Sequence, residues 1–323
     1  MKAIRVTGFG GSDSLELQDV DEPEPGDDEV LIDVEAAGIN FADIMQRRGL
    51  YPGGPQPPFV PGLEAAGTIE AVGENVNRDV GERVVAALNN GGYAEKVVAD
   101  ANSLFDIPES MNFEEAAAIP VQFLTAYCVL HGWGRLEEGE KVLVHAAAGG
   151  VGTAAVQLAD IAGAEVFGTA STQEKLDLAS RLGADHTINY TETEFADEVN
   201  DITDGEGVDL VLDGVGGDTF DSSFDCLAHF GRIVAYGVGS SEIPQVNTPN
   251  LFFGNYSVIG FHLGQAMNHD PGRVVTAIPE LTKHFNEGEL EVIVEHTFEL
   301  EDAAEAHQSI EDRETTGKVV LKP

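Results

Sequence analysis

Short apolar runs separated by turn residues make up the first 120 positions of the chain. The clearest runs carry β-branched or alternating apolar residues and predict strands at residues 30–36, 67–72, 83–87 and 94–98. The segment 51–58, YPGGPQPP, is so rich in proline and glycine that it excludes a helix or a central strand. The pattern predicts an irregular, mainly β domain with a surface loop of the kind that often carries function.

From about residue 117 the pattern changes to an alternation of strands and helices. Periodic apolar positions predict helices at 151–162 and 173–182. Six short apolar runs predict strands at 141–146, 165–170, 186–190, 208–213, 232–236 and 257–261. This order of elements is typical of an α/β protein with a doubly wound parallel sheet.

The pattern changes again after residue 262. A helix is predicted at 274–285, followed by strands at 292–298 and 318–321. We assign these elements to the first domain, which makes that domain discontinuous. The expected domains are 1–122 together with 263–323, and 123–262.

No part of the sequence is expected to enter a membrane or to direct export. The N-terminal residues lack the apolar stretch of a signal peptide. The most apolar window, residues 116–130, contains Pro120 and Gln122 and is shorter than the roughly 20 residues that a spanning helix needs. We expect a buried segment there, and a cytoplasmic protein.

Acidic residues greatly outnumber basic ones. The 323 residues include 57 Asp and Glu against 17 Lys and Arg, a net charge of −40, but 42% are hydrophobic, too many for a disordered acidic tail. Such a charge repels nucleic-acid phosphates and anionic lipids, so neither is an expected partner. The acids are spread along the whole chain, which indicates a protein of haloarchaeal type adapted to concentrated salt.

Two cysteines, Cys128 and Cys226, are the only thiols of the chain. They form no CxxC pair, which excludes a disulfide framework and a four-thiolate zinc lobe. Both lie in apolar helical patterns, where packing is the expected role, and a reducing compartment fits this usage.

A glycine motif follows the first strand of the alternating region. Residues 147–152, AAGGVG, open a helix, with alanine in place of the first glycine of the dinucleotide fingerprint. Small residues let the backbone approach a pyrophosphate, which binds the free N–H groups at the positive end of the helix. An ordinary tight turn is the alternative, but the strand-to-helix context favours a dinucleotide at Gly149, Gly150, Val151 and Gly152.

The end of the second strand of this region indicates which dinucleotide binds. An NAD site usually has Asp or Glu there for the ribose 2′-hydroxyl, whereas this chain has Ser171 and Thr172, followed by Lys175. Two hydroxyls and a lysine favour the 2′-phosphate of NADP(H). The alternative is a solvated helix lysine paired with Glu174 or Asp177.

The glycine motif lies in a longer segment that resembles a known family. Residues 139–152, GEKVLVHAAAGGVG, with Gln157 five residues later, are similar to the quinone oxidoreductase (zeta-crystallin) signature of the medium-chain dehydrogenase/reductase superfamily, from which Asp160 departs. The resemblance covers essentially the whole chain, with further matches at residues 37–43, 61–67, 124–127 and 317–321. Residues 260–264, GFHLG, also resemble the synaptic-vesicle-membrane-protein homologues of the same branch.

This resemblance implies a fold, a cofactor and an assembly. It implies a GroES-like catalytic domain around a Rossmann domain, NADPH in the cleft, and a homodimer joined through the edge of the Rossmann sheet. Position by position, it places Asn40 and Thr125 near the nicotinamide and 149–152 at the pyrophosphate. The other implied cofactor residues are Ser171, Lys175 and Tyr190 at the 2′-phosphate, and Gly237, Phe261, Leu263 and Lys318 along the cofactor.

The same resemblance argues against a catalytic metal. Zinc-dependent relatives have a cysteine at the position of Asn40 and a histidine at that of Leu63, and only Glu64 keeps an acidic character. An amide and an aliphatic side chain cannot replace a thiolate and an imidazole on Zn²⁺, so alcohol dehydrogenation is not expected. Hydride transfer to a quinone or to an α,β-unsaturated carbonyl remains feasible, because either product is a stabilised anion.

Asn40 and Tyr51 are the candidate catalytic residues, as hydrogen-bond donors to such an anion. Tyr51 matches a tyrosine of the family's substrate loop, whereas Met45 stands where a second tyrosine is often found, which changes the expected shape of the quinone pocket. The alternative roles are a turn-capping asparagine and a partly exposed loop tyrosine.

Four other polar residues have a structural and a functional interpretation. His145 lies on a predicted buried strand, where a hydrogen-bonded core histidine is the expected role. In the functional interpretation, Glu64 is a relic of a metal site or a proton donor. In the simpler structural interpretation, it accepts an inter-loop hydrogen bond. Arg47 and Arg48 either attract an anionic substrate or are surface arginines that pair with nearby acidic residues.

The sequence thus supports three functions. The leading one is a zinc-independent, NADPH-dependent oxidoreductase that transfers a hydride to a small-molecule quinone. The second is an NADPH-dependent reductase of enone, enal or acryloyl-type double bonds, in which Tyr51 donates a proton to the α-carbon. The third, of another class, is a non-catalytic NADP(H)-sensing binding protein.

Overall fold

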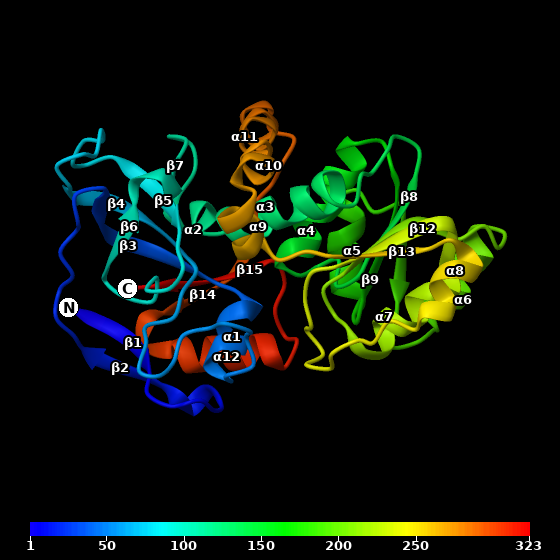
Figure 1. The fold of residues 1–323 in the computed structure, drawn as a ribbon, viewed down its shortest axis with the longest axis horizontal. Helices are drawn as coiled ribbons and strands as arrows, with labels where there is room; N and C mark the ends of the chain where they lie inside the picture. Colours follow the sequence, from blue (N-terminus) through cyan, green and yellow to red (C-terminus); the bar gives the residue numbers. More distant parts are fainter. The chain divides into compact units, whose positions relative to one another are not determined.

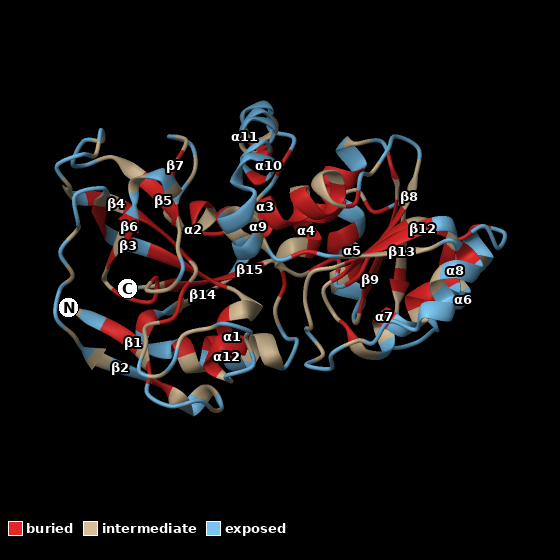
Figure 2. Ribbon diagram, viewed as in Figure 1, coloured by how far each residue is buried: buried red, intermediate tan, exposed pale blue.

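The computed structural model describes residues 1–323, which form two compact units. The first comprises Met1–Val121 and Val292–Pro323, and the second comprises Gln122–Glu291. The first unit is mainly β, and the second is a parallel sheet with connecting helices (Figure 1). In both units the buried residues are concentrated in the strands and in the helix faces that cover them (Figure 2). The predicted architecture, a doubly wound parallel sheet with a mainly β domain, is confirmed.

The first unit is organised around one long strand, β3. The strands of its main sheet are β3 (Glu29–Ile39), β4 (Glu64–Val72), β5 (Arg83–Ala87), β6 (Lys96–Asp100), β7 (Leu104–Asp106), β14 (Val294–Glu299) and β15 (Lys318–Lys322). Their order is β14-β15-β3-β4-β5-β7, with β6 also paired to β3, and every pair except β14 with β15 is antiparallel. A separate antiparallel hairpin pairs β1 (Lys2–Val6) with β2 (Leu15–Asp19).

The two ends of the chain share the core of this unit. Ile4 and Val6 belong to the same buried cluster as Leu300, Val319 and Leu321. Both ends are therefore needed to remove this apolar surface from water, which makes the unit discontinuous in sequence.

Three helices complete the first unit. They are α1 (Phe41–Arg47), α2 (Phe113–Ala116) and α12 (Ala303–Glu311). Helix α1 follows β3 after the single residue Asn40, whose backbone N–H is bound by the Asp43 carboxylate at 2.8 Å. An acid three residues after the N-cap is a helix-start signal, and here it fixes Asn40 at the junction of a buried strand and a helix.

The second unit has the strand order of the Rossmann fold. Its strands are β8 (Lys141–Val144), β9 (Glu165–Ala170), β10 (His186–Asn189), β11 (Val208–Asp213), β12 (Leu227–Ala235) and β13 (Ser257–Gly260). They are all parallel and lie in the order β10-β9-β8-β11-β12-β13. The crossover helices are α4 (Gly150–Ile161), α5 (Gln173–Arg181), α6 (Phe195–Ile202), α7 (Gly217–Ser223) and α8 (Thr248–Gly254). This topology places the carboxyl ends of all six strands at one edge, where such sheets bind ligands.

The second boundary between the compact units differs from the expected one. Residues 263–291 form α9 (Leu263–His269), α10 (Pro271–Val275) and α11 (Ala277–Glu287), and they belong to the second unit rather than to the first. Aromatic and polar contacts hold them there. The Phe285 ring lies 5.0 Å from that of Phe123, and the Arg273 guanidinium lies 4.1 Å from the centre of the Trp133 ring.

Gln157 fixes the end of the second unit. Its amide donates to the Glu291 carbonyl at 3.0 Å and accepts from the Glu291 N–H at 2.8 Å. The Gln157 amide thus binds both backbone groups of Glu291, as a neighbouring strand would. This contact gives Gln157, which lies on the same helix α4 as the glycine motif, a structural role.

The apolar window 116–130 is a buried segment, as expected. It contains the whole of α3 (Pro120–Tyr127), which begins in the first unit and ends in the second. No helix in the structure has both the length and the apolar character needed to span a bilayer. Cys128 and Cys226 are buried and form no disulfide, and burial raises the pKa of both thiols to about 12, in agreement with a packing role.

Charge repulsion at the surface leads to a first prediction. Of the 57 acidic residues only Asp43, Glu64 and Asp213 are buried, so nearly all the negative charge faces solvent. Raising KCl from 0.1 to 1 M shortens the Debye length from about 10 Å to about 3 Å. We expect the melting temperature, followed by circular dichroism, to rise over this range. Sucrose, which carries no charge, is the control, and an equal rise in sucrose would show that screening is not the cause.

Candidate functional site

The carboxyl end of β8 turns directly into α4. Ala146 adopts a left-handed backbone conformation (φ 51°), and the Gly149 N–H donates to the Ala146 carbonyl at 2.8 Å. Gly149 is the N-cap residue, and no side chain caps the first N–H groups of this 12-residue helix. These free donors, at the positive end of the helix dipole, are suited to a phosphate group.

Gly152 lies where α4 passes closest to that turn. A Cβ atom at this position would lie 2.2 Å from the Ala146 carbonyl oxygen and 2.8 Å from the Ala147 Cα. Backbone atoms cannot yield to such a contact, so residue 152 must be glycine for the helix to start here. The predicted motif thus has the local geometry of a dinucleotide turn.

Polar side chains follow the neighbouring strands β9 and β10. Ser171 and Thr172 come directly after β9, and the Thr172 hydroxyl accepts from the Lys175 N–H at 3.4 Å, which caps α5. Tyr190 follows β10, is 38% exposed, and donates its N–H to the Ala170 carbonyl at 3.2 Å. The structure therefore brings all four predicted 2′-phosphate residues to the ends of two adjacent strands.

The remaining predicted cofactor residues of this unit lie farther along the chain. Gly237 follows β12, Phe261 follows β13 with its ring 4.8 Å from that of Trp133, and Leu263 begins α9. Thr125 is buried in α3. Their contact with a cofactor stays a prediction.

His145 is a structural residue. Its ring nitrogens lie 3.1 Å from the Thr169 hydroxyl and 3.0 Å from the Ser223 hydroxyl, and burial lowers the pKa of the imidazole to about 3. The ring is neutral and both of its nitrogens are occupied, which confirms the interpretation as a hydrogen-bonded core histidine.

In the first unit, Asn40, Glu64 and Lys318 form a buried polar cluster. The Asn40 amide nitrogen donates to Glu64 Oε1 at 2.8 Å, and the Lys318 ammonium donates to Asn40 Oδ1 at 2.6 Å and also to Glu64 Oε1. Glu64 is fully buried and Lys318 is 2% exposed, so a complete ion pair lies out of contact with water. The three residues come from the end of β3, the start of β4 and the start of β15.

Glu64 also binds a backbone group. Its Oε2 accepts from the Val121 N–H at 2.8 Å, just before the chain enters the second unit. This confirms the inter-loop hydrogen bond that the sequence favoured for Glu64. Gly38 makes room for the arrangement, because a Cβ atom there would lie 2.3 Å from the Ala117 carbonyl oxygen and 2.7 Å from Lys318 Cε.

These bonds determine what Asn40 offers to a ligand. The carboxamide oxygen is directed to the Lys318 ammonium and one amide N–H to the Glu64 carboxylate. An amide has two N–H groups, so one donor of Asn40 is not used by Glu64. The residue is half-buried, and its orientation is fixed from both sides.

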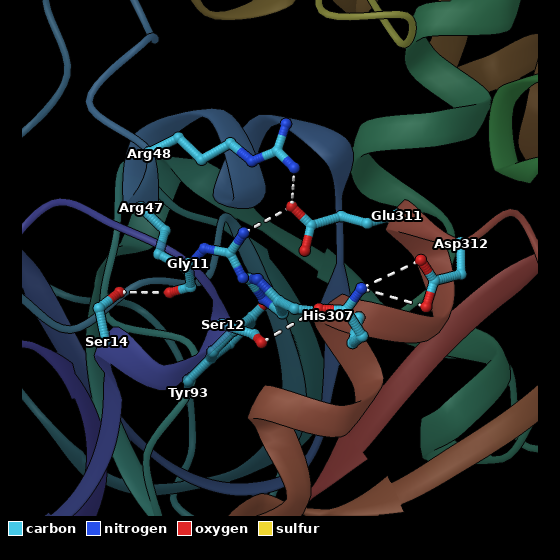
Figure 3. Close-up of polar contacts among 10 residues, drawn as sticks. Gly11, Ser12, Ser14, Arg47, Arg48, Tyr93, His307, Glu311 and Asp312 are labelled. Atoms are coloured by element: carbon cyan, nitrogen blue, oxygen red, sulfur yellow. Dashed lines mark hydrogen bonds and ion pairs between the residues drawn. The ribbon is translucent and has the colours of Figure 1, made fainter.

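A second buried network was not expected from the sequence. The Tyr93 hydroxyl donates to Asp43 Oδ2 at 3.1 Å and lies 3.1 Å from His307 Nε2. Next to His307 on α12, Glu311 Oε1 pairs with Arg47 at 2.6 Å and also with Arg48 (Figure 3).

Arg47 fits neither of the two interpretations that the sequence allowed. It was expected to be a surface arginine or to attract an anionic substrate, but it is fully buried and points into the unit toward α12. Only Arg48, whose side chain is 33% exposed, fits the description of a surface arginine that pairs with an acidic residue. The long separation between Arg47 and Glu311 in sequence explains why the pattern gave no signal of their pairing.

Tyr51 lies in the loop after α1, as predicted. Burial first, and then the charge of Asp43, raise the pKa of its hydroxyl above the ordinary value, so it stays protonated at neutral pH. A neutral phenol is a hydrogen-bond donor, which fits the proposed role of Tyr51. Its catalytic participation stays a prediction.

Comparison with known proteins places the whole chain in one family. Residues 150–283 match the family described as zinc-binding dehydrogenase, and residues 26–109 match the alcohol dehydrogenase GroES-like domain. The chain is 38% identical to a quinone oxidoreductase of Pseudomonas aeruginosa over 100% of this chain and 99% of the relative. It is 37% identical to the zebrafish (Danio rerio) synaptic vesicle membrane protein VAT-1 homolog, over 99% of this chain and 69% of the relative.

A solved structure agrees with the sequence relatives. The Escherichia coli quinone oxidoreductase complexed with NADPH superposes with a TM-score of 0.94 at 34% identity, and 100% of each chain is covered. The match includes both the mainly β unit and the parallel-sheet unit. The chain therefore belongs to the quinone oxidoreductase family of the medium-chain dehydrogenase/reductase superfamily.

Proposed function

We propose that this protein is a zinc-independent, NADPH-dependent oxidoreductase that transfers a hydride to a quinone. The observation that carries the proposal is the cluster of Asn40, Glu64 and Lys318, in which a buried ion pair fixes the Asn40 amide and leaves one of its N–H donors unused by the pair. The name of the Pseudomonas relative supports the acceptor class.

The residues of this cluster do not fit a zinc ion. Asn40 and Leu63 stand where zinc-dependent relatives have a thiolate and an imidazole. The Asn40 oxygen is held by an ammonium group, and the only carboxylate, Glu64, is already paired with the same ammonium. A divalent cation would have to displace Lys318 from two partners, so we derive no step through zinc.

The second unit fits NADPH. The free N–H groups at the start of α4 would hold the pyrophosphate, and Ser171, Thr172, Lys175 and Tyr190 would hold the 2′-phosphate. When bound, NADPH supplies the hydride. The E. coli relative was solved with this nucleotide, which supports the assignment.

The chain's own residues then stabilise the charge that develops on the acceptor. A quinone that receives a hydride becomes a hydroquinone anion, which needs donors aimed at its oxygen more than it needs a base. The available N–H of Asn40 and the neutral hydroxyl of Tyr51 are the donors. Lys318 holds the Asn40 oxygen in place, while its charge is balanced by Glu64.

Oxidation of NADPH, followed at 340 nm in molar KCl, tests the proposal. A 1,4-quinone, a 2-alkenal and an aliphatic aldehyde are offered in parallel, and each is repeated with NADH. Quinone-dependent oxidation that prefers NADPH supports the proposal, and turnover of the aldehyde without turnover of the quinone would overturn the proposed acceptor class. Turnover of the alkenal alone would assign the protein to double-bond reduction, and tight NADPH binding with no turnover would indicate a sensor.

Replacing Lys175 by alanine is expected to weaken NADPH selectively. A charge-assisted hydrogen bond is worth about 1.5–3 kcal/mol, so KM for NADPH should rise roughly tenfold or more while KM for NADH stays unchanged. Steady-state kinetics with both nucleotides measure this. Lys283→Ala removes an exposed lysine of the same unit and is the matched control. An equal rise for both nucleotides would place Lys175 away from the 2′-phosphate.

We also propose a homodimer joined through β13. This strand pairs only with β12 and so ends the sheet, and an unprotected edge strand tends to pair with another chain. Phe252 and Phe253, on the preceding helix α8, are 64% and 79% exposed, a large apolar surface for a monomer to leave in water. Light scattering in molar KCl should give twice the mass of the chain, and a monomeric mass would contradict the proposal.

A further inference from the structure

The loop that carries Tyr51 is bound on both sides by one short N-terminal segment. Before the loop, the Gly10 N–H donates to the Arg47 carbonyl at 3.1 Å. After the loop, the backbones of Val6 and Phe59 exchange two hydrogen bonds, at 2.9 and 3.3 Å. Residues 6–10 therefore hold the chain at the two places where it enters and leaves the loop.

This N-terminal segment is itself held in place. The Thr7 N–H donates to the Ser14 carbonyl at 3.4 Å, and the Ser14 hydroxyl donates to the Gly11 carbonyl at 2.8 Å (Figure 3). The Ser12 hydroxyl donates to Gln308 Oε1 on α12 at 3.2 Å. The segment is thus fixed by its own turn and by a helix from the other end of the chain.

Phe9 is the residue of this segment that reaches furthest along the loop. It has the only side chain among residues 8–11, GFGG. A Cβ atom at Gly49 would lie 2.8 Å from Phe9 Cγ and 3.0 Å from both Cδ atoms, so the ring lies directly over this glycine. Gly49 has φ 71°, the left-handed conformation in which the chain leaves α1. The Phe9 ring therefore contacts the backbone two residues before Tyr51.

Packing of the core does not explain this ring. Phe9 is 45% exposed, and it lies outside the buried cluster that contains Ile4 and Val6. An aromatic side chain left half in water, with glycine on both sides, buries little apolar surface. Its contact with Gly49 is the interaction that the structure gives it.

The middle of the loop depends on its ends. Within residues 51–58 the backbone makes one backbone-to-backbone hydrogen bond, from the Gly54 N–H to the Tyr51 carbonyl at 3.0 Å. Four of the eight residues are prolines, which have no N–H to donate: Pro52, Pro55, Pro57 and Pro58. The backbone at Tyr51 is therefore positioned by the contacts made just before and just after this stretch.

We propose that Phe9 is a positioning residue for Tyr51, whose ring holds Gly49 and so fixes the loop that presents the Tyr51 hydroxyl to the acceptor. The inference rests on the proposed reductase function, in which Tyr51 is a hydrogen-bond donor. Phe9 acts through Tyr51 and needs no contact with the acceptor. Glycine has the greatest backbone freedom of any residue, so Gly49 is the point at which loss of the ring would release the loop.

The first test replaces Phe9 by alanine and measures quinone reduction at saturating NADPH in molar KCl. A displacement of about 1 Å at a reacting group can cost about 100-fold in rate, so we expect kcat to fall by about tenfold or more. The dissociation constant for NADPH should stay unchanged, and Phe9→Tyr, which keeps the ring, should keep most of the activity. Leu17→Ala is the matched control, because it removes an apolar side chain, 36% exposed, from the same hairpin.

A double-mutant cycle distinguishes positioning of Tyr51 from general support of the fold. In a Tyr51→Phe background there is no hydroxyl left to position, so Phe9→Ala should lower the remaining kcat less than about twofold. Loss by the same factor in both backgrounds would overturn the proposal. So would a loss in Leu17→Ala as large as that in Phe9→Ala.

A second measurement does not depend on turnover. The Leu50 N–H donates to the Met45 carbonyl at 2.9 Å and the Gly54 N–H to the Tyr51 carbonyl, so both amides are protected while the loop keeps its position. Their hydrogen exchange, followed by mass spectrometry, should be at least about tenfold faster in Phe9→Ala and unchanged in Leu17→Ala. Unchanged exchange in Phe9→Ala would overturn the role of Phe9 alone. If exchange is faster but the wild type reduces no acceptor, the reductase function fails and the positioning role fails with it.

Discussion

Replacing Lys318 by methionine is expected to destabilise the first unit by about 3–5 kcal/mol, because Glu64 would then be a buried charge without a counterion. Glu64 is fully buried and can reach no other cation among the bonds that the structure contains, since its remaining partners are the amide of Asn40 and the Val121 N–H. Thermal and chemical denaturation in molar KCl measure the loss. The quinone reduction that we propose should fall as well, since Asn40 loses the donor that orients its oxygen.

Two further variants distinguish the effect of the unpaired Glu64 charge on stability from the effect of losing any lysine. The double variant Lys318→Met/Glu64→Gln removes both charges and keeps an acceptor for the Val121 N–H, so it should recover at least half of the lost stability. Lys322→Met lies on the same strand and breaks the exposed pair with Glu114, so it should cost less than about 1 kcal/mol. If the double variant is as unstable as Lys318→Met, the loss of stability comes from losing the ion pair and not from leaving the Glu64 charge without a counterion.

Replacing Gly152 by alanine is expected to abolish most NADPH binding. The added methyl group would lie 2.2 Å from the Ala146 carbonyl oxygen, so the start of α4 must move away from the turn. Even a shift of a few tenths of an ångström misaligns N–H donors whose hydrogen bonds depend steeply on distance and angle. We expect the dissociation constant for NADPH, measured by calorimetry, to rise at least tenfold.

Gly272→Ala is the control for this prediction. Gly272 lies in α10 of the same unit, and a Cβ atom there would meet only an Asp270 side-chain oxygen at 4.0 Å. This variant should bind NADPH as the wild type does. Normal binding by Gly152→Ala would mean that the turn is not the pyrophosphate site.

The sequence predicted the parallel sheet well because its signals are local. Each strand of the second unit is a short apolar run, and all six predicted runs overlap observed strands. The largest difference is β12, which begins at Leu227 instead of residue 232 and contains Phe230 with φ 68°. A strand interrupted by a left-handed residue has no uniform apolar pattern, so its first part was not recognised.

The second domain boundary could not be read in the same way. Residues 263–291 have an ordinary amphipathic pattern, and only their partners assign them to the second unit. Those partners, Phe123 for Phe285 and Trp133 for Arg273, lie about 140 residues or more away in the chain. Periodicity carries no information about contacts at such separations.

The buried networks were the least predictable part of the site. The resemblance identified Asn40 and Lys318, but not that they share Glu64, and it gave no role to Tyr93 or His307. The general rarity of buried arginines even favours a surface position for Arg47, since arginine is almost never fully buried unless it is paired. Chemistry of this kind depends on which side chains the fold brings together, and that information is absent from any single segment.

The position of β15 has a consequence for how the protein is made. This strand lies between β14 and β3 in the sheet, and it carries Lys318, yet the ribosome synthesises it after almost all of the chain. The second unit is one uninterrupted stretch of sequence, so all its strands and the contact of Gln157 with Glu291 are available once residue 291 has been synthesised. In contrast, the counterion of Glu64 is synthesised some 250 residues after Glu64 itself. The second unit can therefore fold during synthesis, while the first unit acquires its charge balance only after β15 has been made.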